Sequence, residues 1–161
     1  MALRIRIASR RSNLALRQVE ILKECFTEDI ETHIVEVITS GDQVLDRSLA
    51  DIGGKGLFIK ELENTILKDD ADIAVHSMKD MPAEYPKGLV MKAILEREDP
   101  RDAFISLKYK SIESLPKNTI MGTSSARRKA FLLRKRPDLK IVNFRGNVNT
   151  RLRKLEEGEV D

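Results

Sequence analysis

The sequence contains few aromatic residues and hardly any cysteine. Among its 161 residues there is no Trp, aromatic residues make up 4%, and Cys25 is the only cysteine. One cysteine excludes an internal disulfide and any metal site built from several thiolates. Scarce aromatic rings leave few stacking platforms for single-stranded nucleic acid. Cys25 stands at helical spacing from Gln18, Ile21 and Leu22, so we expect a buried structural thiol.

Long hydrophobic runs are also missing. Hydrophobic residues form 41% of the chain, which is adequate for a core. No stretch approaches the roughly 18 apolar residues of a transmembrane helix. The first residues, Met-Ala-Leu-Arg-Ile-Arg-Ile, alternate like a strand and lack the apolar region of a signal peptide. We therefore expect a cytoplasmic protein that has no membrane partner and no bound metal.

Charge is distributed unevenly along the chain. Residues 1–99 carry 14 Lys and Arg against 19 Asp and Glu, a net of −5, whereas residues 100–161 carry 15 against 7, a net of +8. Such polarity predicts a polyanionic partner that is held mainly by the second part. A small molecule with several carboxylates explains the charge as well as nucleic acid does. The low aromatic content disfavours nucleic acid.

Residues 72–82 form the most informative segment. The apolar run 73–75 is typical of a strand buried on both faces. Ser77, Lys79 and Asp80 follow in a polar turn, and a proline then ends the segment. Open α/β sheets place ligand chemistry just outside the carboxyl ends of their strands. An ordinary polar surface loop fits this segment equally well when it is considered alone.

Strand patterns alternate with helix patterns over the rest of the chain. We expect strands at residues 3–8, 32–38, 88–95, 103–107, 119–122 and 140–144, and helices at 13–28, 57–68, after the hydroxyl and arginine residues 123–128, and at 150–157. This alternation predicts an α/β fold with mainly parallel sheets. Residues 39–54 should form a long irregular loop of functional or mobile character. The charged run 96–102 is the best candidate for a domain boundary.

Hydroxyl and arginine side chains recur where strands lead into helices. Residues 9–12 and 123–128 share this pattern, and residues 145–151 repeat it with glycine and asparagines. Backbone N–H groups, hydroxyls and guanidinium groups together make a site for carboxylate or phosphate. We therefore predict two similar domains that clamp one anionic ligand. The alternative is that these arginines only solvate the helix ends, although the helix dipole disfavours cations there.

Six motifs stand in order along nearly the whole chain, at residues 6–10, 53–58, 76–82, 97–102, 122–125 and 145–147. Together they resemble the hydroxymethylbilane synthase family, also called the porphobilinogen deaminase family. The resemblance implies a three-domain enzyme whose first two domains are like the lobes of a type II periplasmic binding protein. Residues 1–97 would form domain 1, 98–102 the hinge, and 103–161 a truncated second lobe.

The resemblance also implies a transferase of tetrapyrrole (porphyrin and heme) biosynthesis, usually monomeric. Such enzymes join four porphobilinogen molecules head to tail, with loss of ammonia at each step, to give hydroxymethylbilane. The growing polypyrrole starts from a dipyrromethane cofactor bound to a cysteine of the third domain. Cys25 does not match that position. We therefore expect an N-terminal fragment that lacks the cofactor's anchor and is inactive alone.

By the same resemblance, Asp80 is the catalytic carboxylate that contacts pyrrole nitrogens. We expect it to stay ionised and to stabilise the positive charge left when ammonia departs. The residues that would hold the cofactor and the substrate are Arg10, Ser12, Lys55, Ser77, Lys79, Thr123, Ser124, Ser125, Arg127, Arg128, Arg145, Gly146, Asn147 and Arg151. A two-lobe protein that binds a polycarboxylate small molecule without chemistry is the alternative function.

Overall fold

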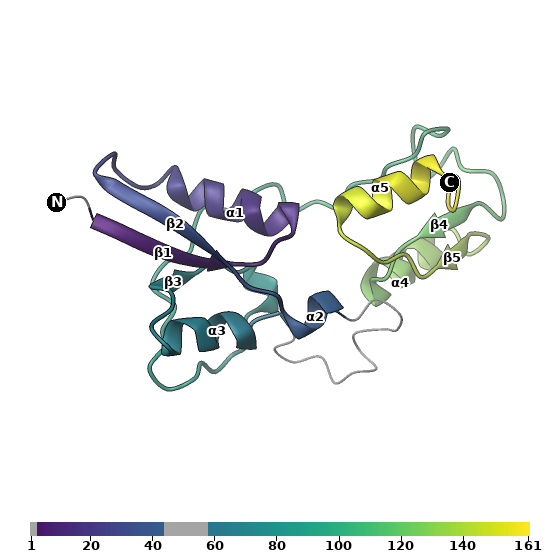
Figure 1. The fold of residues 1–161 in the computed structure, drawn as a ribbon. Helices are drawn as coiled ribbons and strands as arrows, with labels where there is room; N and C mark the ends of the chain where they lie inside the picture. Colours follow the sequence, from purple (N-terminus) through teal and green to yellow (C-terminus); the bar gives the residue numbers. More distant parts are fainter. Residues whose placement is uncertain (1–2, 44–57) are drawn as a thin grey trace. The chain divides into compact units, whose positions relative to one another are not determined.

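The computed structural model describes residues 3–43 and 58–161. The chain divides into two compact units, Met1–Glu96 and Arg97–Asp161 (Figure 1). Each unit combines helices with strands that pair in parallel. The predicted α/β class with mainly parallel sheets is therefore confirmed.

The first unit is built on a three-stranded parallel sheet in the order β2-β1-β3. The strands are β1 (Leu3–Ser9), β2 (Ile30–Glu36) and β3 (Ile73–Ala74). The apolar and polar alternation of β1 places Ile7, which is fully buried, at the centre of the sheet. Ile7 pairs with Ile34 on one side and with Ile73 on the other. Strand β1 is thus the central strand of this unit.

Two helices cover the opposite faces of this sheet (Figure 1). They are α1 (Asn13–Lys23), which connects β1 to β2, and α3 (Lys60–Leu67), which precedes β3. Because β2 and β3 lie on opposite sides of β1, right-handed crossovers require helices on opposite faces. The helices bury Val19 and Leu62 against the sheet. A short helix α2 (Ser40–Gln43) and a 3₁₀ turn η2 (Met78–Asp80) complete the described elements of this unit.

The second unit contains the parallel pair β4 (Ile120–Gly122) and β5 (Lys140–Val142). Helix α4 (Ala126–Lys135) connects them, and α5 (Val148–Glu156) follows β5. Phe144, Leu155 and Val160 form a small buried cluster. Gly158 has a φ of +79°, the left-handed conformation that commonly ends a helix. Gly158 therefore ends helix α5.

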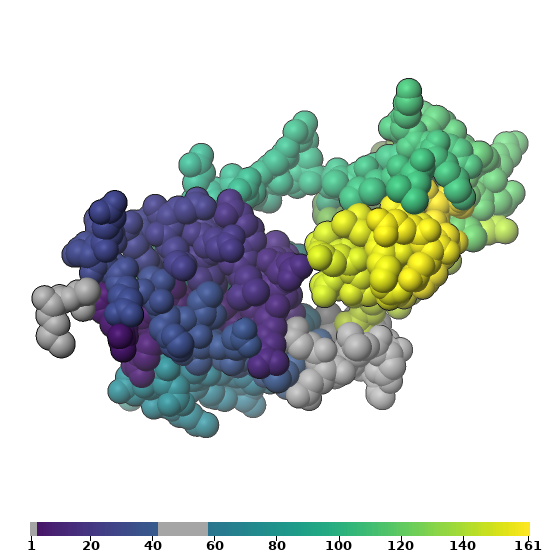
Figure 2. All heavy atoms as spheres, turned by 45° about the horizontal axis from the view of Figure 1, so that its top comes forward, coloured from purple at the N-terminus to yellow at the C-terminus, as the bar shows by residue number. Residues whose placement is uncertain are grey.

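The predictions of two strands are wrong. Residues 88–95 and 103–107 form no strand, although both have apolar residues typical of one. Val90 and Leu107 are each 67% exposed. In Figure 2 this part of the chain, coloured teal to green, lies open at the surface. A strand exists only where a neighbouring strand accepts its hydrogen bonds, and local sequence does not supply that partner.

The expected burial of Cys25 is also wrong. Helix α1 ends at Lys23 instead of continuing to Glu28. Cys25 therefore lies in the turn after the helix, where it is exposed. The other differences are small shifts in element bounds, such as the start of α3 at Lys60 and of β2 at Ile30. The expected irregular loop 39–54 begins with α2, and its remainder lies outside the described residues.

Candidate functional site

The carboxyl ends of β1 and β3 lie side by side. These strands are parallel neighbours, with Ala8 opposite Ala74. Between them the chain crosses from β2, on one side of β1, to β3 on the other. Such a change of side makes the strand ends a topological switch point, where open α/β sheets bind ligands. The segments that follow β1 and β3 therefore meet at the position most suited to a site.

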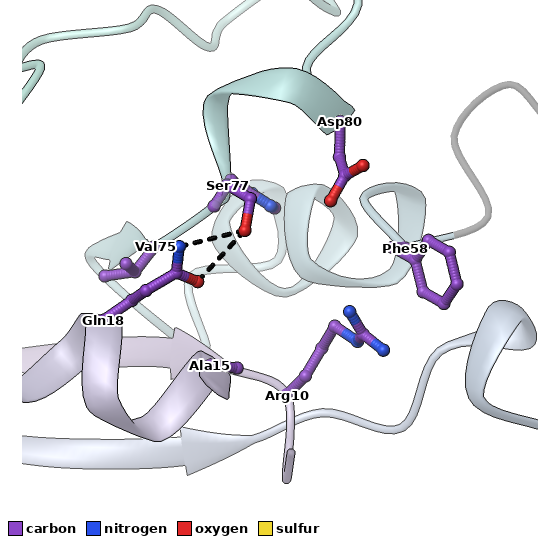
Figure 3. A pocket seen from close by; sticks show the side chains of 8 residues that line it. Arg10, Ala15, Gln18, Phe58, Val75, Ser77 and Asp80 are labelled. Atoms are coloured by element: carbon purple, nitrogen blue, oxygen red, sulfur yellow. Dashed lines mark hydrogen bonds between the residues drawn. The ribbon is translucent and has the colours of Figure 1, made fainter. Parts of the chain in front are cut away.

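An open hollow lies at this position. Its larger compartment has a cavity volume of about 260 Å³ and is lined by Arg10, Ser12, Leu14, Ala15, Gln18, Phe58, Ser77, Lys79 and Asp80. A smaller compartment shares six of these residues and adds Val75 and His76 (Figure 3). The lining combines cations, one carboxylate, hydroxyls and apolar surface. Ligand sites commonly have this mixture of apolar walls and a few convergent polar groups.

Asp80 and Arg10 extend into the hollow from different segments of the chain (Figure 3). Asp80 comes from turn η2 after β3, and Arg10 follows β1. The Arg10 guanidinium lies 4.2 Å from the centre of the Phe58 ring, a favourable cation–π distance. Phe58 in turn occupies the space beside Gly41, where an added Cβ would be 2.2 Å from the ring. The missing side chain of Gly41 thus allows Phe58 to reach Arg10.

Ser77 is held by the side chain of Gln18 on α1. Its Oγ lies 2.9 Å from Gln18 Nε2 and 3.2 Å from Gln18 Oε1 (dashed lines in Figure 3). The backbone N–H of Asp80 also donates to the Ser77 carbonyl at 2.9 Å. These bonds join the first helix to the turn that carries Lys79 and Asp80. The Ser77 hydroxyl therefore positions the turn.

His76 lines the smaller compartment and is half-buried. Burial lowers the pKa of its imidazole, Asp80 opposes this change, and Arg10 adds to it. The net direction favours a neutral imidazole at neutral pH. Neutral His76 can donate one hydrogen bond and accept another inside the hollow.

Six residues of the hollow were not among the predicted site residues: the polar Gln18 and His76, and the apolar Leu14, Ala15, Phe58 and Val75. Gln18 could have been identified from the sequence as a candidate site residue, because it is a polar residue beside Ala15 and Val19 on the buried side of a helix. Phe58 and His76 belong to the motifs, but only the tertiary fold shows that they line this hollow. Ser12 is the N-cap of α1, where its Oγ accepts a hydrogen bond from the Ala15 N–H at 3.2 Å. Lys55 lies outside the described residues.

The hydroxyls at the start of α4 bind groups of the protein itself. Ser124 Oγ donates to Asn143 Oδ1 at 2.7 Å and accepts from the Phe144 N–H at 3.1 Å. Thr123 Oγ1 accepts from the Ser125 N–H at 3.2 Å. Ser125 caps α4 by accepting from the Arg128 N–H at 3.3 Å. These side chains fix the strand-to-helix turn of the second unit.

Arg127 and Arg128 share a carboxylate partner within the protein. Asp102 Oδ1 accepts from Arg128 Nη2 at 2.8 Å and from Arg127 Nη2 at 3.3 Å. Hydrogen bonding by Arg128 is the main cause that lowers the pKa of Asp102, and Arg127 contributes through its charge. The sequence predicted that an anion would compensate these two arginines. Asp102 already supplies one negative charge.

The remaining predicted residues lie in the turn between β5 and α5 and on α5 itself. Gly146 adopts a φ of +122°, and the next residue, Asn147, caps α5 by accepting from the Thr150 N–H at 2.8 Å. Arg145 precedes them in the same turn. Arg151 Nε is buried without a hydrogen-bond partner among the described residues. An unpaired buried guanidinium nitrogen is a donor that a ligand could satisfy.

Within residues 3–43 and 58–161 no helix is both long and apolar enough to cross a membrane. In the same ranges no three His, Cys, Asp or Glu side chains gather in a way that could hold a metal ion.

The fold and the hollow together define an α/β protein with a polar site at the carboxyl ends of parallel strands. A family model described as "Porphobilinogen deaminase, dipyromethane cofactor binding domain" matches residues 5–161. The chain therefore belongs to the porphobilinogen deaminase family, as the sequence motifs predicted.

The names of individual similar proteins support this family assignment. Proteins named porphobilinogen deaminase from Rickettsia rickettsii, Rickettsia africae and Rickettsia conorii are each 53% identical to the chain over 160 residues. These matches cover 98% of this chain and 46% of each relative. The chain thus spans about half the length of the curated relatives that it matches.

Proposed function

We propose that this chain forms part of a hydroxymethylbilane synthase, a transferase of tetrapyrrole biosynthesis. The reaction condenses four porphobilinogen molecules head to tail and releases ammonia at each step. The observation that carries the proposal is the convergence of Asp80, Arg10 and Lys79 on one hollow at the ends of β1 and β3. Membership of the porphobilinogen deaminase family supports the same reaction.

The lining of the hollow suits the chemistry of porphobilinogen. Each substrate molecule carries two carboxylates, so the growing polypyrrole becomes a dense polyanion. Arg10 and Lys79 offer positive charge, and Ser12 offers a hydroxyl. Asp80 offers a carboxylate that can accept hydrogen bonds from pyrrole N–H groups. Phe58 and Leu14 supply apolar walls for the pyrrole rings.

Asp80 is proposed to act on the step that releases ammonia. Breaking the carbon–nitrogen bond leaves positive charge on the substrate, which an ionised carboxylate stabilises. The carboxylate can also pass a proton when the leaving amine is within hydrogen-bond reach. Ser77 and Gln18 would keep Asp80 in place through the turn that they hold.

The same donors fit a dipyrromethane cofactor, which has carboxylates and pyrrole N–H groups of the same kind. Arg10, Ser12 and Lys79 would hold its carboxylates, while Asp80 would face its pyrrole nitrogens. The cofactor supplies the primer to which substrate units are joined. Its covalent anchor is proposed to be a cysteine of a third domain. Cys25 is exposed in the turn after α1 and is not among the described residues that line the hollow.

The second unit is proposed to hold further carboxylates of the polypyrrole. Its candidates are the residues in the strand-to-helix turns and on the helices that follow, namely Thr123, Ser124, Ser125, Arg127, Arg128, Arg145, Gly146, Asn147 and Arg151. We propose the domain division 1–97, 98–102 and 103–161, with lobes like those of a type II periplasmic binding protein. We further propose a cytoplasmic, monomeric enzyme that binds neither nucleic acid nor membranes.

Calorimetric titration of the 161-residue chain with porphobilinogen tests this proposal. We expect saturable binding that Arg10→Gln weakens, because a cation is removed from the hollow. Arg17→Gln is the matched control, since Arg17 pairs with Glu20 and Glu24 and is not among the described residues lining the hollow. We expect the chain alone to release no ammonia. Absence of binding, or equal weakening by both substitutions, would contradict the proposal.

A further inference from the structure

Asp102 lies between two consecutive arginines of α4. Its Oδ1 accepts from Arg128 through Nε at 3.0 Å and Nη2 at 2.8 Å. The same carboxylate accepts from Arg127 Nη2 at 3.3 Å. Consecutive residues of an α-helix point about 100° apart, so these two side chains would otherwise diverge. One carboxylate thus draws both guanidinium groups together.

The nearest acidic neighbour of Asp102 in the charged run has a different partner. Arg101 Nε lies 2.9 Å from both carboxylate oxygens of Asp99. The backbone N–H of Arg101 also donates to Asp99 Oδ1 at 3.0 Å. This ion pair is local to the run, whereas Asp102 reaches across the sequence to α4. The two aspartates therefore have separate roles although only three positions separate them.

Asp102 accepts hydrogen bonds from only some of the N–H donors of each guanidinium group. A guanidinium has five N–H donors. Among the described residues, Nε of Arg127 and Nη1 of both arginines have no hydrogen-bond partner, and the two side chains are 65% and 43% exposed. Several donors on adjacent guanidinium groups thus remain available to a second carboxylate.

We propose that Asp102 is a positioning residue that holds Arg127 and Arg128 side by side for recognition of ligand carboxylates. This inference rests on the proposed binding of a polycarboxylate by the chain. It gives a role to a charged residue of the run 96–102 beyond that of a hinge. The ligand binds the outward donors of both arginines, and Asp102 keeps its own bonds to them.

The physical reason is preorganisation. Two like charges in the first turn of a helix repel each other, and the helix dipole disfavours them there. Without Asp102 each long side chain would sample solvent, and binding would then require both to be immobilised. Supporting hydrogen bonds that lock a binding side chain reduce this loss of entropy. The lowered pKa of Asp102 keeps its carboxylate charged at neutral pH.

Two aspartate substitutions in the same run test the inference. Asp102→Asn frees the arginines of α4, whereas Asp99→Asn breaks only the local pair with Arg101. Each substitution raises the net charge of the protein by one. The long-range attraction between the protein and a polyanionic ligand therefore changes equally in the two variants. The ligands are porphobilinogen and pyromellitate, a benzene tetracarboxylate without pyrrole chemistry, titrated calorimetrically into the 161-residue protein. We expect Asp102→Asn to bind pyromellitate about three- to fivefold more weakly than Asp99→Asn does.

Nuclear magnetic resonance supplies a readout that does not depend on a ligand. In the unsubstituted protein the Nε–H signal of Arg128, which donates to Asp102, should be resolved and protected from exchange. Asp102→Asn should move this signal to its solvent-averaged position while the backbone amide spectrum remains that of a folded protein. Asp99→Asn should leave the signal unchanged, and Asp102→Glu should restore part of the affinity.

The outcomes separate this inference from the proposed function. Equal or tighter binding of pyromellitate by Asp102→Asn than by Asp99→Asn would overturn the inference, as would an unchanged Nε–H signal of Arg128. If the protein binds pyromellitate in an Asp102-dependent way but does not bind porphobilinogen, the inference stands and the proposed function fails. A protein that binds neither ligand would overturn the inference as well.

Discussion

Gln18 and Ser77 are 59 positions apart in sequence, yet their side chains meet at the edge of the hollow. The Ser77 hydroxyl lies 2.9 Å from Gln18 Nε2 and 3.2 Å from Gln18 Oε1. The amide can therefore donate to this hydroxyl and accept from it. Through this contact α1 supports the turn that carries Lys79 and Asp80, so the position of Asp80 depends on a residue of the first helix.

We expect Gln18→Leu to lower both stability and ligand affinity. The substitution removes the hydrogen bond to Ser77, a loss of about 1 kcal/mol in the free energy of unfolding. A double-mutant cycle with Ser77→Ala, followed by urea denaturation, measures the coupling between the two side chains. Lys23→Gln, at an exposed position of the same helix, is the control. Additive effects of Gln18→Leu and Ser77→Ala would show that the two side chains do not interact.

Asp72 should stabilise the first unit in a pH-dependent manner. It accepts from the Arg6 N–H at 2.6 Å and from Arg6 Nη2 at 2.8 Å, and these hydrogen bonds lower the pKa of Asp72. Because the folded pKa lies below the unfolded value of about 3.9, the stabilisation is complete above that value. It disappears as the pH falls through the folded pKa. Asp72→Asn should therefore lower the urea midpoint at neutral pH.

The difference between Asp72→Asn and the unsubstituted protein should shrink under acid conditions. Asp70→Asn is the matched control, because Asp70 is an exposed carboxylate of the same turn. Urea midpoints measured across the acidic range would show the trend. A midpoint difference for Asp72→Asn that stays constant with pH would contradict the role of its charge.

Glu63 should have the opposite pH dependence. Its Oε1 is buried without a hydrogen-bond partner among the described residues, and burial raises the pKa of Glu63. A raised folded pKa means that folding favours the protonated form. The contribution of Glu63 to stability is then greatest below the unfolded value of about 4.3, and it is lost as the pH rises through the folded pKa. Glu63→Gln should raise the urea midpoint at neutral pH, whereas exposed Glu84→Gln should not.

Gly122 should be required for packing in the second unit. A Cβ at this position would lie 2.6 to 2.9 Å from atoms of the Phe144 side chain, which belongs to the buried cluster of this unit. We expect Gly122→Ala to reduce the free energy of unfolding by about 1–3 kcal/mol through overpacking. Gly158→Asn is the control, because no atom lies within 4 Å of a Cβ there and Asn tolerates the left-handed conformation. Equal thermal unfolding of Gly122→Ala and the unsubstituted protein would refute the close approach.

Local patterns in the sequence predict much of this fold. The alternation of β1 and the Ser12 cap of α1 depend on residues that are near one another in the chain. Residues 88–95 and 103–107 show the limit of such patterns, because their apolar residues are typical of strands but no strand of the described residues pairs with them. Cys25 shows a second limit, since its burial depended on where α1 ends.

The candidate site was predictable mainly through motifs. Asp80, Lys79 and Arg10 lie in segments that the strand-end rule or the family motifs single out. Gln18 acts through a contact across the fold, which periodicity does not predict. Asp102 appeared only as one charge in a presumed hinge, and its bonds to Arg127 and Arg128 depend on the tertiary structure.

The proposed catalytic role of the Asp80 carboxylate can be tested in a chimeric enzyme. Residues 1–161 of this chain would replace the matching part of the Rickettsia conorii relative, and ammonia release from porphobilinogen would be followed. We expect the chimera to turn over and Asp80→Asn to lose about 10²-fold or more in rate, while it stays folded and binds substrate. Asp70→Asn should retain full activity. Undiminished ammonia release by Asp80→Asn would contradict the account.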